Sequence, residues 1–592
     1  LDLAPGADVG VVFALGQGET HARALDLIRR WKDPAETQRA WTESRAAWAD
    51  RLGRLVVKTP DPAFDLMVNR WLPCQTLNAR VRARAGYYQA GGAFGFRDQL
   101  QDILALIFAD PRTARAHILV AAAHQFEEGD VLHWWHPPSG RGVRTRCSDD
   151  LLWLPYVVAA YVQATGDATI LEETVPFLSG PPLAPEETDR YASFATAPGR
   201  NLFEHCERAL DRGDRLGEHG LPLMGSGDWN DGMDRVGDKG KGESVWLAWF
   251  LIAAIEGFVE LSGRMNRTDL QEKWRARSAA LAAAADRAGW DGDWYLRAYD
   301  DDGRAWGSAA ENECRIDSIA QSWAVLSGAA PAERASRAVA SALHHLVRED
   351  DDIIRLLDPP FDRTPREPGY IKAYPPGVRE NGGQYTHAAA WLAMAVARLG
   401  DGEGAKALFD RINPIRHALT PEAAEAFRVE PYVLAGDVSS NEAFVGRGGW
   451  TWYTGAAVWT WKLAVEEIIG VRLVEGAVQI APCLPRGWDR AEVTLRRDAG
   501  TIALTLRNPH GLSTGRVVLT VNGAPWTAAS IPFPELGQTC QVDAELVPGP
   551  PAGQDVRAPA RGNASPQPEA ATVIDPGGEL SGDGHGSPDG QG

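Results

Sequence analysis

Apolar runs of helix length recur through most of this chain of 592 residues. Long polar loops rich in Gly, Trp, Arg and Asp separate many of them. Helices that alternate with such loops are typical of an α-helical toroid whose site lies at one mouth. The pattern therefore predicts a mainly α protein with an (α/α) barrel over residues 60–469. The runs lie at 64–77, 102–108, 113–124, 151–162, 245–261, 316–326, 332–346, 388–399 and 455–469.

The segments on either side of this helical region have different patterns. Residues 470–548 alternate with a period of two, which predicts a small C-terminal β-sandwich, and Asn522-Gly523 is typical of a hairpin turn. Residues 549–592 are rich in Pro, Gly, Ala, Asp and Ser, which predicts a disordered tail. Residues 1–16 predict one β-strand, and residues 17–59 return to helical spacing and predict linker helices.

Composition narrows the class of function. The net charge of −19 argues against a nucleic acid or an anionic membrane as the main partner. The 22 tryptophans exceed both Tyr and Phe in number, and indoles in such excess serve either carbohydrate stacking or packing between helices. The six scattered cysteines have no metal-ligand spacing, so we expect free thiols in a reducing compartment. No apolar run is expected to span a membrane, and the N-terminus lacks the pattern of a signal peptide.

One short loop, residues 225–235, carries three carboxylates and an indole between glycines. Its sequence is Gly-Ser-Gly-Asp-Trp-Asn-Asp-Gly-Met-Asp-Arg. The flat face of a pyranose can lie on Trp229, and its hydroxyl groups can bond to Asp228, Asp231 or Asp234. This predicts a sugar site; the alternative is a surface Asx-turn with an incidental Trp.

Two loops nearer the N-terminus have a similar character. In residues 87–102, a helix that begins near Phe96 would place Asp98 and Asp102 on one face with Arg97 beside them. The alternative is a helix start whose acids complement the dipole. The second loop, residues 133–150, holds paired Trp, two His, three Arg and two Asp. His133 and His136 lack an evident third ligand, so we do not predict a metal site there.

Two later loops also lead into apolar helices. Residues 379–387 bring Glu380, an amide and His387 to one helix start. In residues 446–455, the Thr454 hydroxyl and the N–H of Gly455 precede a helix and can bind an oxyanion or a phosphate. Because several Gly-, Trp- and charge-rich loops all enter helices of one domain, we expect them to share one pocket.

These motifs resemble the glycoside hydrolase family 94 phosphorylases, which include the cellobiose and chitobiose phosphorylases. The resemblance covers roughly residues 1–540. It is nearest to β-1,2-oligoglucan phosphorylases and to the C-terminal region of cyclic β-1,2-glucan synthases. It rests on Tyr-Gln-Ala-Gly-Gly-Ala-Phe-Gly-Phe-Arg-Asp-Gln-Leu-Gln-Asp at 88–102, His-Trp-Trp-His-Pro-Pro-Ser-Gly-Arg-Gly-Val-Arg-Thr at 133–145, Gly-Asp-Trp-Asn-Asp-Gly at 227–232 and Glu-Asn-Gly-Gly-Gln-Tyr-Thr-His at 380–387.

The resemblance implies an (α/α)6 barrel with a C-terminal β-sandwich, in which residues 1–16 are the last strand of a truncated N-terminal sandwich. It also implies residue roles. Asp231 matches the general acid, and we expect burial to keep it protonated. Substrate-binding residues are then Arg97, Asp98, Asp102, Trp229, Glu380 and Gln384, with Glu380 on the acceptor side. Phosphate-binding residues are His387, Thr454 and Gly455, with Arg235 and Lys241 as candidate basic partners.

The implied reaction is the reversible, inverting phosphorolysis of a β-linked glucan to α-glucose 1-phosphate, with β-1,2-glucooligosaccharide as the nearest substrate. Inorganic phosphate is the co-substrate, and we expect no metal, no other cofactor and no nucleic acid. The intact protein is expected to be a homodimer. It is expected in the cytoplasm, or on the cytoplasmic face of the inner membrane as the phosphorylase region of a cyclic glucan synthase. Two alternatives stay open, an inverting α-barrel glycoside hydrolase and a non-catalytic carbohydrate-binding module of a larger synthase.

Overall fold

The computed structural model describes residues 2–82, 92–184, 186–452, 454–497 and 500–550. Helices occupy most of the region between residues 62 and 468, and strands occupy the region from 471 to 547. The prediction of a mainly helical protein followed by a β-rich segment is confirmed. The expected tail from 551 onward, and the motif residues 88–91, lie outside the described residues.

Six helices form a closed ring. Each contacts the next along the chain, and α16 returns to contact both α5 and α4. These inner helices are buried over most of their length, which explains why their sequences are apolar nearly all round. They are α5 (Phe96–Ala109), α7 (Trp153–Thr165), α9 (Val245–Arg264), α11 (Ser318–Leu326), α13 (Thr386–Arg398) and α16 (Ala456–Lys462), which continues as η9 (Leu463–Ile468).

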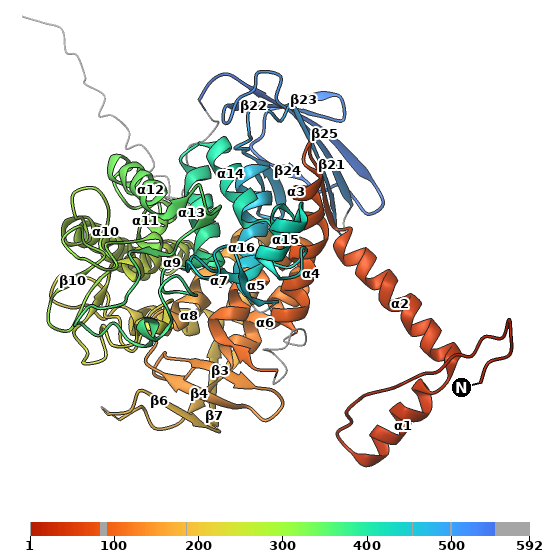
Figure 1. Cartoon of the computed structure of the whole chain (residues 1–592), viewed down its shortest axis with the longest axis horizontal. Coiled ribbons are helices and arrows are strands. Elements are labelled where there is room, and N and C mark those ends of the chain that lie inside the picture. Colours follow the sequence, from red (N-terminus) through yellow and green to blue (C-terminus); the bar gives the residue numbers. More distant parts are fainter. Residues whose placement is uncertain (1, 83–91, 185, 453, 498–499, 551–592) are drawn as a thin grey trace, which may run out of the picture. The chain divides into compact units, whose positions relative to one another are not determined.

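Other helices pack on the outside of this ring, as Figure 1 shows. Each buries one stripe and exposes the other face, as amphipathic helices do. They are α6 (Pro111–Ala122), α8 (Leu202–Gly213), α10 (Thr268–Ala288), α12 (Ala332–Leu346) and α14 (Gly402–Ile412). A helical segment over residues 62–81 packs against α5 and α16 and consists of α3 (Pro62–Leu66), η1 (Met67–Trp71), α4 (Leu72–Gln75) and η2 (Thr76–Val81). The short helix α15 (Pro421–Phe427) lies in a later connection.

Tryptophan fills the centre of the ring. Trp153, Trp246, Trp323, Trp391 and Trp459 are all fully buried. Their rings contact one another, with centroids 5.2 Å apart for Trp323 and Trp391 and 5.5 Å apart for Trp391 and Trp459. The excess of Trp therefore serves mainly packing between helices, which is the second of the two uses considered above.

The helix α9 is long and apolar enough to cross a membrane by length and composition, contrary to the expectation that no run qualifies. Most of it is buried inside the protein. Its apolar character is accounted for by its place in the inner ring, where all of its faces meet other side chains.

Several connections predicted as polar loops fold into small sheets. The largest has the order β2-β3-β4-β6, made of β2 (Phe94–Gly95), β3 (Leu132–His136), β4 (Arg141–Thr145) and β6 (Asp189–Ala192). Beside it, β5 (Thr174–Ser179) pairs with β7 (Ala195–Asn201). Shorter strands support other connections: β8 (Glu243–Ser244), β9 (Ala298–Tyr299), β10 (Ala305–Trp306), β11 (Ile316–Asp317), β12 (Val347–Arg348), β13 (Ile353–Ile354), β14 (Leu357–Asp358), β15 (Gln384–Tyr385), β16 (Ala435–Val438) and β17 (Gly448–Thr451).

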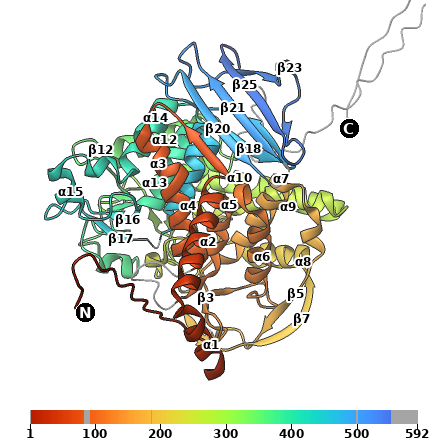
Figure 2. The ribbon, with the colours of Figure 1, turned by 90° about the vertical axis from the view of Figure 1, so that its right-hand side faces the viewer.

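The strands after residue 470 form two sheets, seen above the helices in Figure 2. Asn522 and Gly523 join β22 to β23 with positive φ angles of 50° and 81°, which confirms the predicted hairpin turn. One sheet has the order β18-β19-β24: β18 (Val471–Val474), β19 (Ala477–Ile480) and β24 (Ile531–Pro532). The other has the order β1-β20-β21-β25-β22-β23: β1 (Leu55–Lys58), β20 (Arg490–Arg496), β21 (Thr501–Arg507), β25 (Thr539–Val547), β22 (Arg516–Val521) and β23 (Ala524–Trp526).

The structure of the N-terminal segment differs from the prediction in two places. Residues 2–18 form no strand, and Phe13 and Leu15 are exposed, because a lone strand has no partner for its backbone groups. The helices α1 (His21–Trp31) and α2 (Pro34–Leu52) are present as predicted, yet neither buries a residue. Residues 55–58, expected to be helical or linker, instead form β1 and pair with β20.

Candidate active site

A cavity of about 550 Å³ lies where the inner helices α5 and α13 begin, and residues of all five singled-out loops line it together with the β2-β3-β4-β6 sheet. This supports the expectation of a shared pocket. Its wall includes Arg80, Gly95, Arg97, Asp98, Gln101, His133, Trp134, His136, Trp229, Asn230, Asp231, Tyr370, Tyr374, Arg379, Glu380, Tyr385, His387, Trp450, Thr454 and Gly455. The fifth loop, residues 446–455, supplies Trp450, Thr454 and Gly455, so every loop reaches the cavity.

The acidic loop is held by a buried ion pair at its base. Arg297 donates to both carboxylate oxygens of Asp228 at 2.6 and 2.7 Å, and neither side chain is exposed. Ser244 at the start of α9 also donates to Asp228, at 2.7 Å. Asp234 accepts from the backbone N–H of Tyr370. Asp228 and Asp234 therefore shape the loop, while Asp231 faces the cavity.

Asp231 lies between two cationic side chains. Arg97 Nη2 is 2.6 Å from its Oδ1, and His133 Nε2 is 3.9 Å from its Oδ2. Its side chain is 40 % exposed, so the expected burial of Asp231 is not found. Charged side chains of the cavity wall, rather than apolar ones, contact this carboxyl group.

Buried carboxylates fix both cations in place. Arg97 also pairs with Asp149 at 2.7 Å and donates to the backbone oxygen of Asp228 at 3.0 Å. Asp150 Oδ2 lies 2.7 Å from His133 Nδ1. Burial alone would lower the pKa of His133, but Asp150 and then Asp231 outweigh it and raise the pKa to about 9. His133 is therefore an imidazolium at neutral pH, a role that its sequence neighbours did not reveal.

His133, Cys147 and Asp150 offer three ligand atoms within 4.8 Å of one another. The chemistry of this group does not suit a cation. Arg97 places its guanidinium 3.6 Å from the Cys147 sulfur and 3.5 Å from Asp150. Burial raises the pKa of the Cys147 thiol well above its ordinary value, so the thiolate that binds metals is disfavoured.

Arg80 is the basic residue that the sequence analysis missed. It lies on η2 with its side chain 3 % exposed, and it pairs with Asp102 at 2.8 Å and Asp98 at 2.9 Å. The predicted helix start at Phe96 is confirmed, and both acids share the face that meets Arg80. Burial would raise the pKa of Asp98, but Arg80 and then Arg97 lower it to about 2.

Asp102 differs from its neighbour on α5. Burial outweighs Arg80 and raises the pKa of Asp102 to about 7. Its side chain is 1 % exposed and is not among the cavity-lining residues. Asp102 therefore supports Arg80 from beneath, whereas Asp98 lines the cavity.

Gly455 leaves room for His387 and Arg80 to approach it. A Cβ atom at Gly455 would lie 2.8 Å from His387 Cε1 and 3.7 Å from Arg80 Nη2. Burial, and then the charge of Arg80, lower the pKa of His387 well below its ordinary value, so this imidazole is neutral. Its Nε2 has no hydrogen-bond partner among the residues described. The Thr454 hydroxyl accepts from Ala456 N–H at 3.0 Å and lines the same corner.

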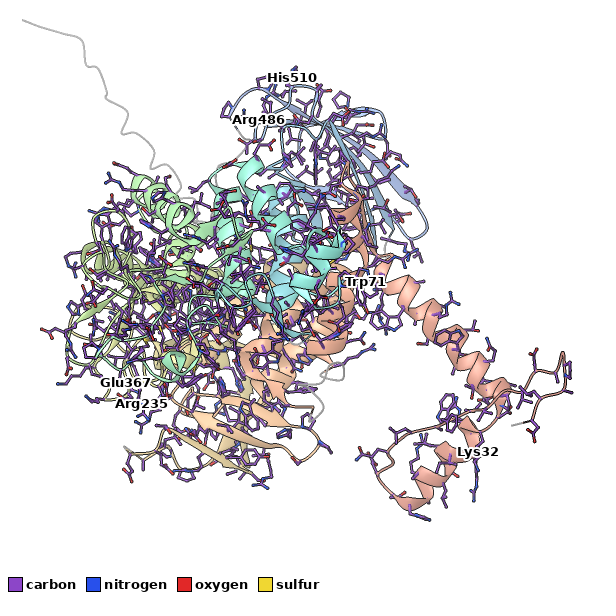
Figure 3. The ribbon with its side chains drawn as sticks, in the orientation of Figure 1. Lys32, Trp71, Arg235, Glu367, Arg486 and His510 are labelled. Atoms are coloured by element: carbon purple, nitrogen blue, oxygen red, sulfur yellow. The ribbon has the colours of Figure 1, made fainter. Side chains whose placement is uncertain are left out.

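The structure does not bring three other predicted residues to the cavity. Arg235 points to the surface, where Figure 3 labels it close to Glu367, and pairs with Asp238 at 3.0 Å. Lys241 is also exposed, and its backbone N–H bonds to Asp301. Among the residues described, neither lines the cavity, whereas Arg80 lies beside Gly455. Gln384 is buried, and its side chain accepts from Ile354 N–H.

Trp229 and Glu380 both line the cavity. Trp229 is 7 % exposed, lines the cavity and packs edge-on against Tyr385 and His387, with centroids 5.4 and 5.2 Å apart. Burial raises the pKa of Glu380, and the guanidinium of Arg379 lies 3.4 Å from its carboxyl. Arg379 itself lies over the Trp450 ring at 3.7 Å.

Comparison with known proteins identifies the family of this chain. The chain belongs to the glycosyl hydrolase 94 superfamily, whose catalytic domain matches residues 47–470. It is 46 % identical over 523 residues to the cyclic beta-(1,2)-glucan synthase NdvB of Rhizobium meliloti, covering 88 % of this chain and 18 % of that protein. It is 26 % identical over 556 residues to the N,N'-diacetylchitobiose phosphorylase of Vibrio proteolyticus, covering 88 % of this chain and 66 % of that enzyme.

The chain is also similar to two proteins of lower sequence identity. The 1,2-beta-oligoglucan phosphorylase of Listeria innocua is 24 % identical over 457 residues, covering 71 % of this chain and 40 % of that enzyme. A GH78 family rhamnosidase of Bacillus sp. GL1 shares the fold, with a TM-score of 0.52 and 13 % identity over 78 % of this chain and 43 % of that one. The chain thus spans less than two thirds of the length of each of these relatives.

Proposed function

We propose that this chain catalyses the reversible, inverting phosphorolysis of a β-linked glucan, with β-1,2-glucooligosaccharide as substrate and α-glucose 1-phosphate as product. One observation carries the proposal: Asp231 shares a cavity with a corner formed by Arg80, His387 and Gly455. A proton donor and an anion site in one cavity suit a reaction in which phosphate replaces the leaving sugar. The similarity to NdvB and to the 1,2-beta-oligoglucan phosphorylase supports the β-1,2 linkage.

In the proposed reaction, Asp231 gives its proton to the glycosidic oxygen as the bond to the anomeric carbon breaks. Once the proton has left, Arg97 and His133 stabilise the carboxylate that forms, since both already point at its oxygens. Trp229, Arg97 and Asp98 hold the sugar that is transferred, and Glu380 binds the acceptor side.

Phosphate attacks the anomeric carbon from the opposite face and forms the new bond, so the configuration inverts. His387, Thr454 and Gly455 bind it, with Arg80 in place of the exposed Arg235 and Lys241. Phosphate is already a nucleophile, so no second carboxylate has to activate water, as an inverting hydrolase requires. Inorganic phosphate is then the co-substrate, and no metal or other cofactor takes part.

The test incubates the protein with β-1,2-glucooligosaccharides, with and without phosphate, and measures glucose 1-phosphate and reducing sugar. We expect glucose 1-phosphate only when phosphate is present. Asp231→Asn should lower the rate by about 10²- to 10⁴-fold, whereas Asp234→Asn, in the same loop, is the matched control. Phosphate-independent release of reducing sugar would favour a hydrolase. No turnover, with retained glucan binding, would favour a carbohydrate-binding module.

We also infer that the ring of inner helices and its outer layer form an (α/α)6 barrel, since α5, α7, α9, α11, α13 and α16 close on one another. The two later sheets then correspond to a C-terminal β-sandwich. Similarity over 18 % of NdvB supports a place as the phosphorylase region of a cyclic β-1,2-glucan synthase. We propose that this region acts on the cytoplasmic side of the membrane. We propose a homodimer for the intact protein, which light scattering would test.

A further inference from the structure

The β2-β3-β4-β6 sheet leads out of the cavity. Gly95 and Trp134 line the cavity, and the strand register places Gly95, Trp134, Val143 and Tyr191 in one row across the four strands. Side chains in one row of a sheet point to the same face. Trp135, the next residue along β3, is buried, as expected for the opposite face. The row therefore runs from the cavity wall to the edge strand β6.

Aromatic and polar side chains lie on this face around the buried Val143. The rings of Trp134 and Tyr191 have centroids 5.4 Å apart, and His136 lies 5.1 Å from Trp134. The Tyr191 hydroxyl is 3.3 Å from His136 Nδ1. Arg141 places its guanidinium 4.6 Å from the centre of the Tyr191 ring. Tyr191 remains 43 % exposed, so its ring keeps a free surface although its neighbours hold it in place.

We propose that Trp134, His136, Arg141 and Tyr191 form a platform that binds glucose units of the glucan chain outside the cavity. The inference rests on the proposed function. The apolar face of a pyranose packs on an aromatic ring, and its hydroxyls bond to side chains at the rim. His136, Arg141 and the Tyr191 hydroxyl supply such groups beside the two rings.

Continuity with the cavity identifies the occupant. Trp134 and His136 belong to both the cavity wall and the platform. A glucan chain that is longer than the cavity must continue along the surface of the protein. The row of rings begins at the cavity wall and offers such a surface. A purely structural cluster would bury its rings, whereas Tyr191 lies exposed on an edge strand. The platform would give the protein a preference for long chains over disaccharides.

The experiment measures binding by calorimetry, so it does not depend on turnover. The ligands are a β-1,2-linked glucose disaccharide and a long β-1,2-glucan chain, and the proteins are the wild type, Tyr191→Ala, Tyr191→Trp and Trp41→Ala. Trp41 is an exposed ring on α2, outside both the cavity and the platform. We expect Tyr191→Ala to reduce the affinity for the long chain relative to the disaccharide by about 2- to 10-fold. Tyr191→Trp should retain the preference, and Trp41→Ala should leave it unchanged.

Several results would overturn the platform. One is a wild type that binds both ligands equally well. Another is a Tyr191→Ala protein, with unchanged thermal unfolding, that keeps the long-chain preference. A change in oligomeric state without a change in that preference would assign the face to a second copy of the chain. The phosphorolysis assay separates the two proposals. If the protein produces glucose 1-phosphate but Tyr191→Ala does not change the preference for the long chain, the platform alone is refuted. If the protein binds the long chain with that preference but shows no turnover, the proposed reaction alone is refuted.

Discussion

The substitution Gly455→Ala tests the packing of the corner formed by Arg80, His387 and Gly455, which we propose binds phosphate. The backbone of Gly455 has φ −69° and ψ −8°, which alanine adopts without strain. The added Cβ, however, would lie 2.8 Å from His387 Cε1 and 2.9 Å from its Nδ1. This is about 1 Å shorter than the favourable carbon–carbon separation. His387 cannot simply move aside, because Trp391 packs against its ring at a centroid distance of 4.5 Å.

Two effects should follow from this collision. Overpacking in a close-packed interior costs about 1–3 kcal/mol of unfolding free energy. A displacement of about 1 Å at a reacting group can lower the rate roughly 100-fold. We therefore expect kcat/KM for phosphate in Gly455→Ala to fall about 10- to 100-fold, together with a lower unfolding temperature.

The assay records initial rates at increasing phosphate concentration together with thermal unfolding. Gly487→Ala is the matched control, because a Cβ at Gly487 would meet no atom within 4 Å. The control should unfold and turn over like the wild type. If Gly455→Ala also keeps the wild-type KM for phosphate and the wild-type unfolding temperature, the corner is not packed as described, and the assignment of phosphate to it is refuted.

Three further predictions concern the buried charges. Arg80→Met should lower the unfolding free energy by about 3–5 kcal/mol and raise the KM for phosphate, because two acids lose their cation. Arg297→Met should destabilise by a similar amount, about 3–5 kcal/mol, through the unpaired Asp228, measured by denaturant unfolding. The pKa of His133 is raised to about 9 from an unfolded value near 6.5, so its stabilisation, up to about 3 kcal/mol, is complete below pH 6.5 and lost as pH rises through 9. His133→Gln should not show this loss of stability at alkaline pH, as measured by denaturant unfolding at a series of pH values. If the stability of His133→Gln varies with pH as in the wild type, the ion pair between His133 and Asp150 is contradicted.

Local patterns in the sequence predicted much of the fold. The start of α5 near Phe96 followed from a Gly-rich loop before an apolar run, and the turn at Asn522 from its pairing with Gly523. Apolar runs of helix length revealed the inner helices, because these helices are buried on nearly all faces. It did not reveal the sheets inside the connections, since short strands such as β2 are stabilised by distant partners rather than by their own alternation.

The acidic loop and Arg97 were predicted as parts of the site, but the cations His133 and Arg80 were not. Arg80 lies in an apolar helical run, 18 and 22 residues before the acids that it pairs with. Nothing in the adjacent sequence distinguishes it from an arginine on a solvated helix face. The residues Arg235 and Lys241 looked better placed only because they are close to Asp231 in sequence. Proximity in a cavity depends on how helices close into a ring, which local patterns do not specify.

Buried arginines recur in this site, and their common geometry indicates what they do. Arg97, Arg80 and Arg297 each pair with at least two carboxylates while almost fully buried. Such pairs contribute little net stability compared with apolar packing of the same volume, since two charges must leave water. They do fix the positions of side chains that face the cavity, and fixed dipoles and charges stabilise developing charge without reorganising during the reaction. Because Arg97 contacts Asp231 and Arg80 lies beside Gly455, the same arrangement would, in the proposed reaction, orient the proton donor and the phosphate at opposite ends of the bond that breaks.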